Sequence, residues 1–282
     1  MTFCRKMAKF PARVHVILAR EARTALIIRR GPSKSVCTIG WDRDHDTFEL
    51  GQWLRGRIYE RRCDLSPDGK HFIYFAMNGK WMSDVKGSWT AISRTPFLKA
   101  IGLWANGSCW NGGGLFTANS KYWLNAFMYG HYPMDVPTGL KEQDEFPFHE
   151  AYGGECPGVY YIRLQRDGWD LVRHAKEGAN DGYTVFQKKL PLGWIIEKTA
   201  HATINHPVGK GCYYDTHRLL HPDQDVSLDF PDWEWADLDG ERLVWIEAGI
   251  LKAATLMRDG PDFVKDLYDF NEMSFKPIKA PY

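Results

Sequence analysis

Two groups of histidines and carboxylates contain the residues whose types and spacing could do chemistry in this sequence of 282 residues. Asp215 and His217 are two positions apart in a segment with strand composition, so an extended backbone would place both side chains on one face. A carboxylate beside an imidazole can orient and charge it, which is the arrangement used in general base catalysis. Inside a β-sheet, such a pair more often satisfies hydrogen bonds. We therefore interpret Asp215 and His217 as structural and keep them as an alternative site.

The second group lies between residues 128 and 157, a stretch with loop composition, and consists of His131, Tyr132, His149, Glu150 and Tyr152. Histidine and carboxylate side chains are common ligands of Zn²⁺ and Mn²⁺. The spacing of these residues is not that of a known metal motif, so we expect loop histidines without a metal. Long ordered loops are often functional, and we predict that these five residues and Trp110, which lies at a turn, bind a partner.

The motifs that mark the common catalytic and cofactor sites are absent from the sequence. It has no Gly-x-Ser-x-Gly nucleophile elbow, no phosphate-binding GxxxxGK[ST] loop and no HExxH helix. The glycine-rich run Asn111-Gly112-Gly113-Gly114 has no helix after it that could hold a phosphate, so we interpret it as a tight turn. We predict no catalytic residue, no metal and no cofactor.

The charge balance, the hydropathy and the cysteines narrow the class of protein. Lys and Arg number 36 and Asp and Glu 35, a balance that argues against nucleic-acid binding by bulk charge. No apolar run is long enough to cross a membrane, and the apolar run 14–19 is too short for a signal-peptide core. The six cysteines form no CxxC pair, and we expect free, mostly buried thiols. Together these features predict a cytoplasmic protein.

The elements that must position the candidate residues are predicted to be β-strands. Short runs rich in Val, Ile, Tyr, Phe, Trp and Thr alternate with Gly, Asp and Pro turns, which is typical of an all-β protein. We expect strands at 13–19, 25–30, 35–41, 48–54 and 158–164, among others. The segment 262–268 is the one helix that the pattern predicts.

Tight turns recur along the chain. Ser66-Pro67-Asp68-Gly69 precedes an apolar strand, Asp239-Gly240 does the same later, and Asn111-Gly112 follows Asp68-Gly69 after 43 residues. The segment 65–74 resembles the WD40-like repeat of TolB-type β-propellers, a likeness that holds for single repeats only and implies a fold but no particular activity. It implies a single β-propeller domain over 1–282. Five blades are expected at 12–56, 57–98, 99–166, 167–226 and 230–275, with the inserted loop 128–157 in blade three. Six blades, or a β-sandwich, are the alternatives.

Two functions remain open from the sequence. The first is a non-catalytic module that binds or scaffolds another protein, because the repeat pattern comes without a catalytic motif. The alternative is a propeller hydrolase or lyase that acts on a carbohydrate or lactone with channel-facing carboxylates such as Asp64, Asp237 and Glu247. The 12 Trp, 13 Tyr and 15 Phe are expected mainly to pack between blades. The aromatic residues predicted at turns, and hence available for recognition, are Trp41, Trp81, Trp110 and Tyr132.

Overall fold

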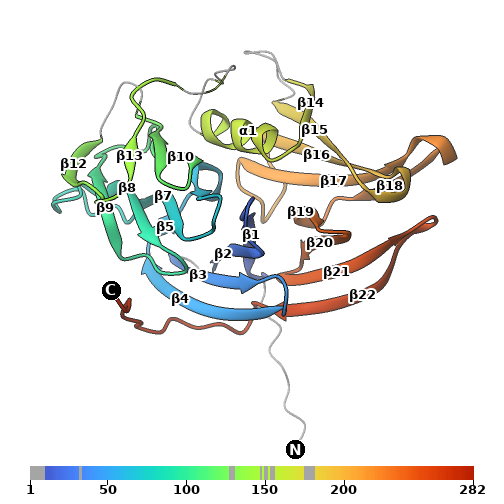
Figure 1. Ribbon diagram of the computed structural model, residues 1–282, viewed down its shortest axis with the longest axis horizontal. Helices are drawn as coiled ribbons and strands as arrows, with labels where there is room; N and C mark the ends of the chain where they lie inside the picture. Colours follow the sequence, from blue (N-terminus) through green and yellow to red (C-terminus); the bar gives the residue numbers. More distant parts are fainter. Residues whose placement is uncertain are drawn as a thin grey trace, which may run out of the picture. The chain divides into compact units, whose positions relative to one another are not determined.

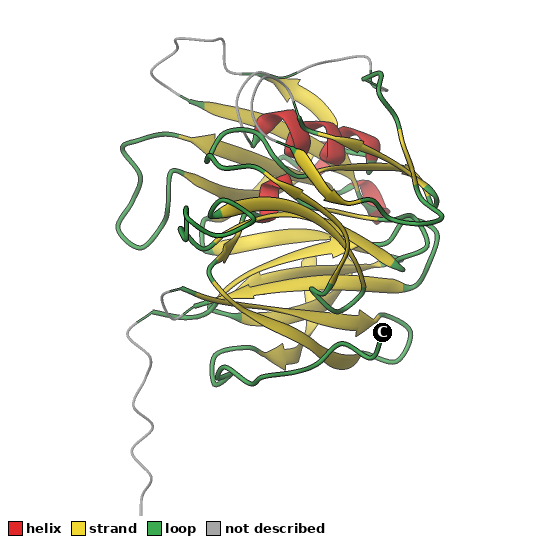
Figure 2. Cartoon of the chain, turned by 90° about the vertical axis from the view of Figure 1, so that its left-hand side faces the viewer, coloured by secondary structure: helices red, strands yellow, loops and turns green. Residues whose placement is uncertain are grey.

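The computed structural model describes residues 10–31, 34–126, 131–146, 148, 152, 156–174 and 182–282. Within them, strands dominate: there are 22 strands, one α-helix and three short 3-10 helices (Figures 1 and 2). The chain divides into two compact units. Unit 1 contains residues 1–14 and 170–274, and unit 2 contains residues 15–169 and 275–282. The prediction of an all-β fold is confirmed.

Three of the five sheets lie in unit 2. Sheet 1 has the order β1-β2-β3-β4; its strand β1 begins with two residues of unit 1. Sheet 2 has the order β12-β9-β8-β7-β5, with β6 also paired to β7, and sheet 3 has the order β10-β11-β13. The bounds are β1 Arg13–Leu18, β2 Thr24–Arg30, β3 Ser35–Asp42, β4 Thr47–Arg55, β5 Arg57–Ile58, β6 Asp64–Leu65, β7 His71–Met77, β8 Ser88–Arg94, β9 Ala100–Ala105, β10 Gly114–Ala118, β11 Lys121–Leu124, β12 Tyr132–Asp135 and β13 Lys141–Glu142.

The sheets of unit 2 pack in the order in which their first strands occur in the chain. One core cluster joins Leu26 and Val36 of sheet 1 to Phe72 and Tyr74 of β7, and a second joins the opposite face of sheet 2 to Phe116 of β10. A third cluster joins sheet 3 to helix α1 (Pro157–Arg166). The alternation of side chains along β7 explains this, because successive residues of a strand point to opposite faces. Sheet 2 is therefore buried on both faces.

The other two sheets lie in unit 1. Sheet 4 has the order β14-β15-β16-β17-β18 and sheet 5 the order β19-β20-β21-β22. Lys188 of β15 pairs with Asp237 of β19, and the indole of Trp194, just before β16, donates a hydrogen bond to the carbonyl of Met257. The bounds are β14 Asp170–Arg173, β15 Tyr183–Lys189, β16 Ile195–Ala202, β17 Tyr213–His221, β18 Val226–Phe230, β19 Trp233–Asp239, β20 Arg242–Glu247, β21 Ile250–Met257 and β22 Gly260–Asp269.

Two predicted elements are wrong. The expected strand 158–164 belongs to helix α1, where Pro157 occupies a first-turn position and every residue from 158 to 164 is buried. A run that is buried all round shows no helical period, so its β-branched and aromatic residues resembled a strand. The expected helix 262–268 lies in β22, whose pairing with β21 overrides the weak local preference.

The expected blade boundaries also need correction. The segment 100–105, assigned to the third blade, is β9 and pairs with β8 in sheet 2. The predicted insertion 128–157 does not form one loop in the residues described: β12 joins sheet 2, β13 joins sheet 3 and α1 begins at Pro157. These pairings join residues that are far apart in the sequence, and local turn signals do not report them.

Candidate functional site

Four strand ends of sheet 2 meet at one end of the sheet (Figure 1). Strand register aligns Met77 with Ser88, Trp89 with Ala105, and Ala105 with Tyr132. The loops that leave this end, 78–87 and 106–113, therefore lie beside the start of β12. We call the exposed apolar residues here the loop surface: Trp81, Met82, Trp110, Tyr132, Met134 and Val136.

Contacts across the loop surface hold its parts in place. The ammonium of Lys86 lies 4.1 Å from the centre of the Tyr132 ring, and the same side chain packs on Gly107. The Asn106 amide donates a hydrogen bond to the carbonyl of Trp110 at 3.0 Å. The loop surface is thus an ordered feature to which three chain segments contribute.

The exposure of these side chains is unusual for apolar residues. Relative exposure is 51% for Trp81, 100% for Met82, 59% for Trp110 and 57% for Tyr132. Six of the eight large apolar side chains that are exposed in the described part of unit 2 belong to the loop surface. Contiguous exposed apolar side chains mark interaction sites more often than single ones do.

His131, the residue before β12, is hydrogen-bonded to β8. Its Nε2 lies 3.0 Å from the hydroxyl of Thr90, which also accepts a hydrogen bond from the backbone N–H of Gly113 at 2.8 Å. Burial lowers the pKa of His131 to about 4, so the ring is neutral at pH 7. His131 therefore connects β12 to the turn that carries Trp110.

The structure does not bring all the predicted binding residues together. Tyr152 donates a hydrogen bond to Gln165 at 2.6 Å and packs edge-on against Tyr161, both on helix α1. His149 and Glu150 lie outside the described residues. Of the four aromatic residues predicted at turns, Trp41 is 1% exposed and stacks on Phe48 across the β3–β4 hairpin.

Asp215 and His217 both lie on the buried face of β17, as the alternation predicted. Nδ1 of His217 is 3.0 Å from the carbonyl of Trp233, and the buried Lys198 is paired with His217 in the register of β16 and β17. Burial, reinforced by the charge of Lys198, lowers the pKa of His217 to about 3. A neutral imidazole at 3% exposure is positioned to join sheets 4 and 5.

The three carboxylates expected at a channel have different surroundings. Asp64 is fully buried in unit 2 and receives two hydrogen bonds from Arg166, at 2.6 and 2.9 Å. Asp237 of unit 1 pairs with Lys188 at 2.6 Å, and Glu247 lies 3.9 Å from Lys252. Asp64 is thus ion-paired with helix α1 and Asp237 with strand β15.

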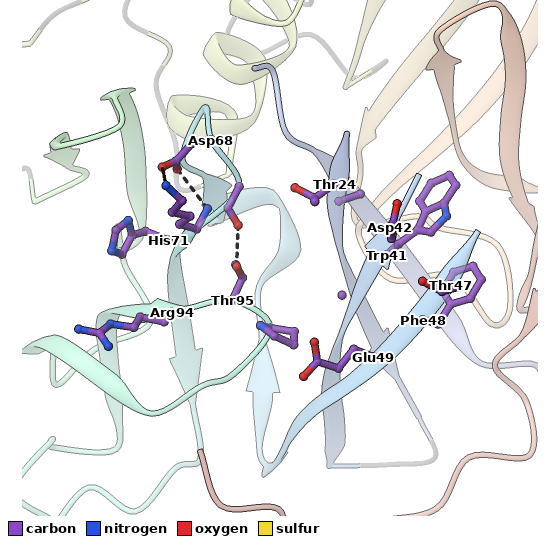
Figure 3. Close-up of a pocket in the computed structure, with 15 residues that line it drawn as sticks. Thr24, Trp41, Asp42, Thr47, Phe48, Glu49, Asp68, His71, Arg94 and Thr95 are labelled. Atoms are coloured by element: carbon purple, nitrogen blue, oxygen red, sulfur yellow. Dashed lines mark hydrogen bonds and ion pairs between the residues drawn. The ribbon is translucent and has the colours of Figure 1, made fainter. Parts of the chain in front are cut away.

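A cleft of about 810 Å³ opens between the β3–β4 hairpin of sheet 1 and two turns of sheet 2 (Figure 3). Asp68, His71, Arg94 and Thr95 lie on one wall, and Trp41, Asp42, Phe48 and Glu49 on the other. Burial alone would raise the pKa of Asp68, but hydrogen bonds from Ser66 and Lys70 lower it. Burial lowers the pKa of His71. Within the described residues, no group of histidine, cysteine and carboxylate side chains could hold a metal ion.

Comparisons with known proteins add little to this geometry. No family model matches the sequence, and no curated protein matches it. A hydrazine synthase from Kuenenia stuttgartiensis is similar in structure over 90% of this chain and 80% of its own, with 9% identity and a TM-score of 0.31. A TM-score this low does not establish a shared fold. Among the described helices, none has the length and apolar composition to span a membrane.

Proposed function

We propose that the protein is a cytoplasmic five-bladed β-propeller that binds another protein through the loop surface. Five sheets begin one after another along the chain, and the packing of sheet 2 between sheets 1 and 3 is what stacked blades require. The five described cysteines are free thiols, which favours a reducing compartment. The resemblance of 65–74 to WD40-like repeats supports the same architecture.

The observation that carries the binding function is the exposure of Trp110 and Tyr132 at the end of sheet 2 where the loop 106–113 leaves beside Tyr132. Tryptophan and tyrosine each bury about 150–250 Å² when covered, and they dominate the energy of protein interfaces. Met82, Met134 and Val136 have no ring on which a sugar or base could stack, whereas they complement apolar side chains of a protein. A protein partner therefore fits the whole loop surface.

A pull-down from extract of the source cells tests this function. The bait is the full chain, compared with Trp110→Ala/Tyr132→Ala and with a control, Phe263→Ala, which removes a side chain of 73% exposure from unit 1. A photo-crosslinking residue at position 82 marks the proteins that touch the loop surface. We expect one stoichiometric protein that crosslinks at 82, is lost with the double variant and is retained with the control. Equal retention by both variants, or no crosslinked protein, would refute the proposal.

A hydrolase or lyase acting on a carbohydrate or lactone is the second candidate, because three carboxylates, Asp42, Glu49 and Asp68, line the cleft in Figure 3. Glu49 is exposed on its wall and has no ion-pair partner among the described residues. Turnover of a glycan or lactone panel that is abolished by Glu49→Gln and retained by Glu247→Gln would support this activity. Absence of turnover across the panel would leave the binding function as the better account.

A further inference from the structure

A second cleft in unit 2, of about 800 Å³, is lined by cationic side chains. It lies between Gly31 and Lys34, which follow β2 and precede β3, the junction of β4 and β5, and the start of the β7–β8 loop. Its lining consists of Arg30, Gly31, Lys34, Ser35, Arg55, Gly56, Arg57, Met77, Asn78, Gly79 and Phe275. It shares no lining residue with the cleft in Figure 3 and none with the loop surface.

All the charged side chains that line this cleft are cationic. Four cations line it and no carboxylate does, whereas the cleft in Figure 3, of nearly equal volume, has three carboxylates against Lys70 and Arg94. No described carboxylate makes an ion pair with Lys34 or Arg55. Like charges repel one another, so four cations around one cleft raise the free energy of the empty protein. An anion bound between them offsets this repulsion.

Two of the arginines are held in position by aromatic rings. The guanidinium of Arg55 lies 4.9 Å from the centre of the Phe275 ring, and that of Arg57 lies 4.4 Å from the centre of the Tyr59 ring. Stacking on a ring restricts the guanidinium plane while its N–H edge stays available for an oxyanion. Both side chains therefore lose less conformational entropy on binding an anion than unrestrained arginine side chains would.

The third arginine, Arg30, is oriented by a carboxylate that is not part of the cleft lining. Arg30 pairs with Glu60 at 3.1 Å. Burial acts to raise the pKa of Glu60, but Arg30 and Arg57 hold it at about 2, so Glu60 is ionised. One negative charge against four cations still leaves the cleft with a surplus of positive charge.

We propose that this cleft binds a small polyphosphate anion, free or as the phosphate chain of a nucleotide. Arginine side chains bind phosphate oxygens with paired, charge-assisted hydrogen bonds, and several such groups around one cleft match an anion with more than one phosphate. The volume exceeds what a single phosphate fills and lies in the range of small-molecule sites. A Cβ built on Gly31 or on Gly79 would meet no atom within 4 Å, so a ligand can approach the backbone there.

Calorimetric titration with inorganic tripolyphosphate tests the cleft. The variant Lys34→Gln/Arg55→Gln removes two cations that have no ion-pair partner among the described residues, and so leaves Glu60 and its contacts intact. The matched control is Lys70→Gln/Arg94→Gln, which removes a lysine and an arginine from the cleft in Figure 3; there Arg94 also lies on a ring, 5.0 Å from the centre of Tyr282. Thermal unfolding of each variant shows that it is folded.

We expect one tripolyphosphate per chain, a dissociation constant at least about tenfold weaker in the Lys34→Gln/Arg55→Gln variant, and a change within about twofold in the control. Raising NaCl from about 50 to about 200 mM should weaken binding to the wild type. Tighter binding of ATP than of tripolyphosphate would identify a nucleotide, and equal binding a phosphate chain alone. No binding at millimolar tripolyphosphate, equal losses in both variants, or tight binding of single-stranded oligonucleotides instead would overturn the proposal.

Discussion

The buried ion pair of Asp64 and Arg166 links three elements of unit 2, and its removal should reveal how much they depend on it. Asp64 of β6 accepts two hydrogen bonds from Arg166, the last residue of α1, and one from the backbone N–H of Phe116 in β10 at 2.7 Å. The Asp64 side chain is 0% exposed and that of Arg166 is 12% exposed. Burial acts to lower the pKa of Arg166, but Asp64 and Asp167 raise it above its usual value.

The substitution Asp64→Ala leaves a buried guanidinium and a buried N–H without their acceptor. Removing one partner of a buried pair costs about 3–5 kcal/mol. Arg166 keeps a hydrogen bond to Asp167 at 2.9 Å, which places the expected loss of unfolding free energy near the lower end of that range. The double variant Asp64→Leu/Arg166→Met removes both charges, and we expect it to lose less than about 2 kcal/mol.

Urea unfolding measures both losses. For a slope of about 2–3 kcal/mol per molar urea, the Asp64→Ala variant should unfold at a midpoint lower by about 1–2 M. Hydrogen exchange of peptides from β7, measured across the urea series, assigns the transition to unit 2 rather than unit 1. A loss below about 1 kcal/mol for Asp64→Ala, or a double variant that loses the sum of the two single variants, would refute the reasoning.

Three further predictions follow from individual residues. Gly113 has φ of 76° and lies against the backbone of Arg62, so Gly113→Ala should lower the unfolding free energy by about 2–4 kcal/mol in urea titrations; Gly139→Ala, where a Cβ meets open space, is the control. The pKa of His217 is about 3 in the folded chain against 6.5 ordinarily, so the unfolded chain binds more protons between these values and the unfolding free energy falls as the pH drops from 6.5 to 3. His217→Gln should reduce the slope of unfolding free energy against pH by roughly 1 kcal/mol per pH unit in urea titrations at several pH values. An unchanged slope would contradict the assignment. Peptide mapping after brief alkylation of the native chain should find label on the exposed Cys109 and Cys212 and, because burial protects their thiols, little on Cys37, Cys63 and Cys156; equal labelling of all five would contradict this.

The strands of sheet 1 show how much of the fold the local sequence determines. The predicted ranges 13–19, 25–30, 35–41 and 48–54 agree to within a residue or two with β1 to β4. Their β-branched residues and the turns between them act over a few residues, where sequence patterns are informative. The strand predicted at 158–164 is wrong for a tertiary reason. These residues of α1 are buried on every side, so the sequence lacks the alternation of apolar and polar residues that indicates a helix.

The candidate site was predictable only in part. Trp110 and Tyr132 could be named as exposed aromatic residues near turns, but the position of Tyr132 beside the start of the loop 106–113 depends on the pairing of β12 with β9, about 30 residues earlier. Lys86 was not predicted at all, since its contact with the Tyr132 ring depends on the same register. Trp41, also predicted at a turn, is buried because Phe48 lies opposite it across the hairpin.

The sequence by itself determined the strand content, the tight turns and the near-neutral charge, because each depends on composition or on neighbours a few positions away. Tertiary structure alone decided which charges meet. Arg30, Lys34, Arg55 and Arg57 converge on one cleft although the chain as a whole carries a formal net charge of +1. Asp64, which from sequence resembled a channel acid, is instead neutralised by Arg166, about a hundred residues later. Electrostatic interactions depend on distance and burial, and strand register and sheet packing set both.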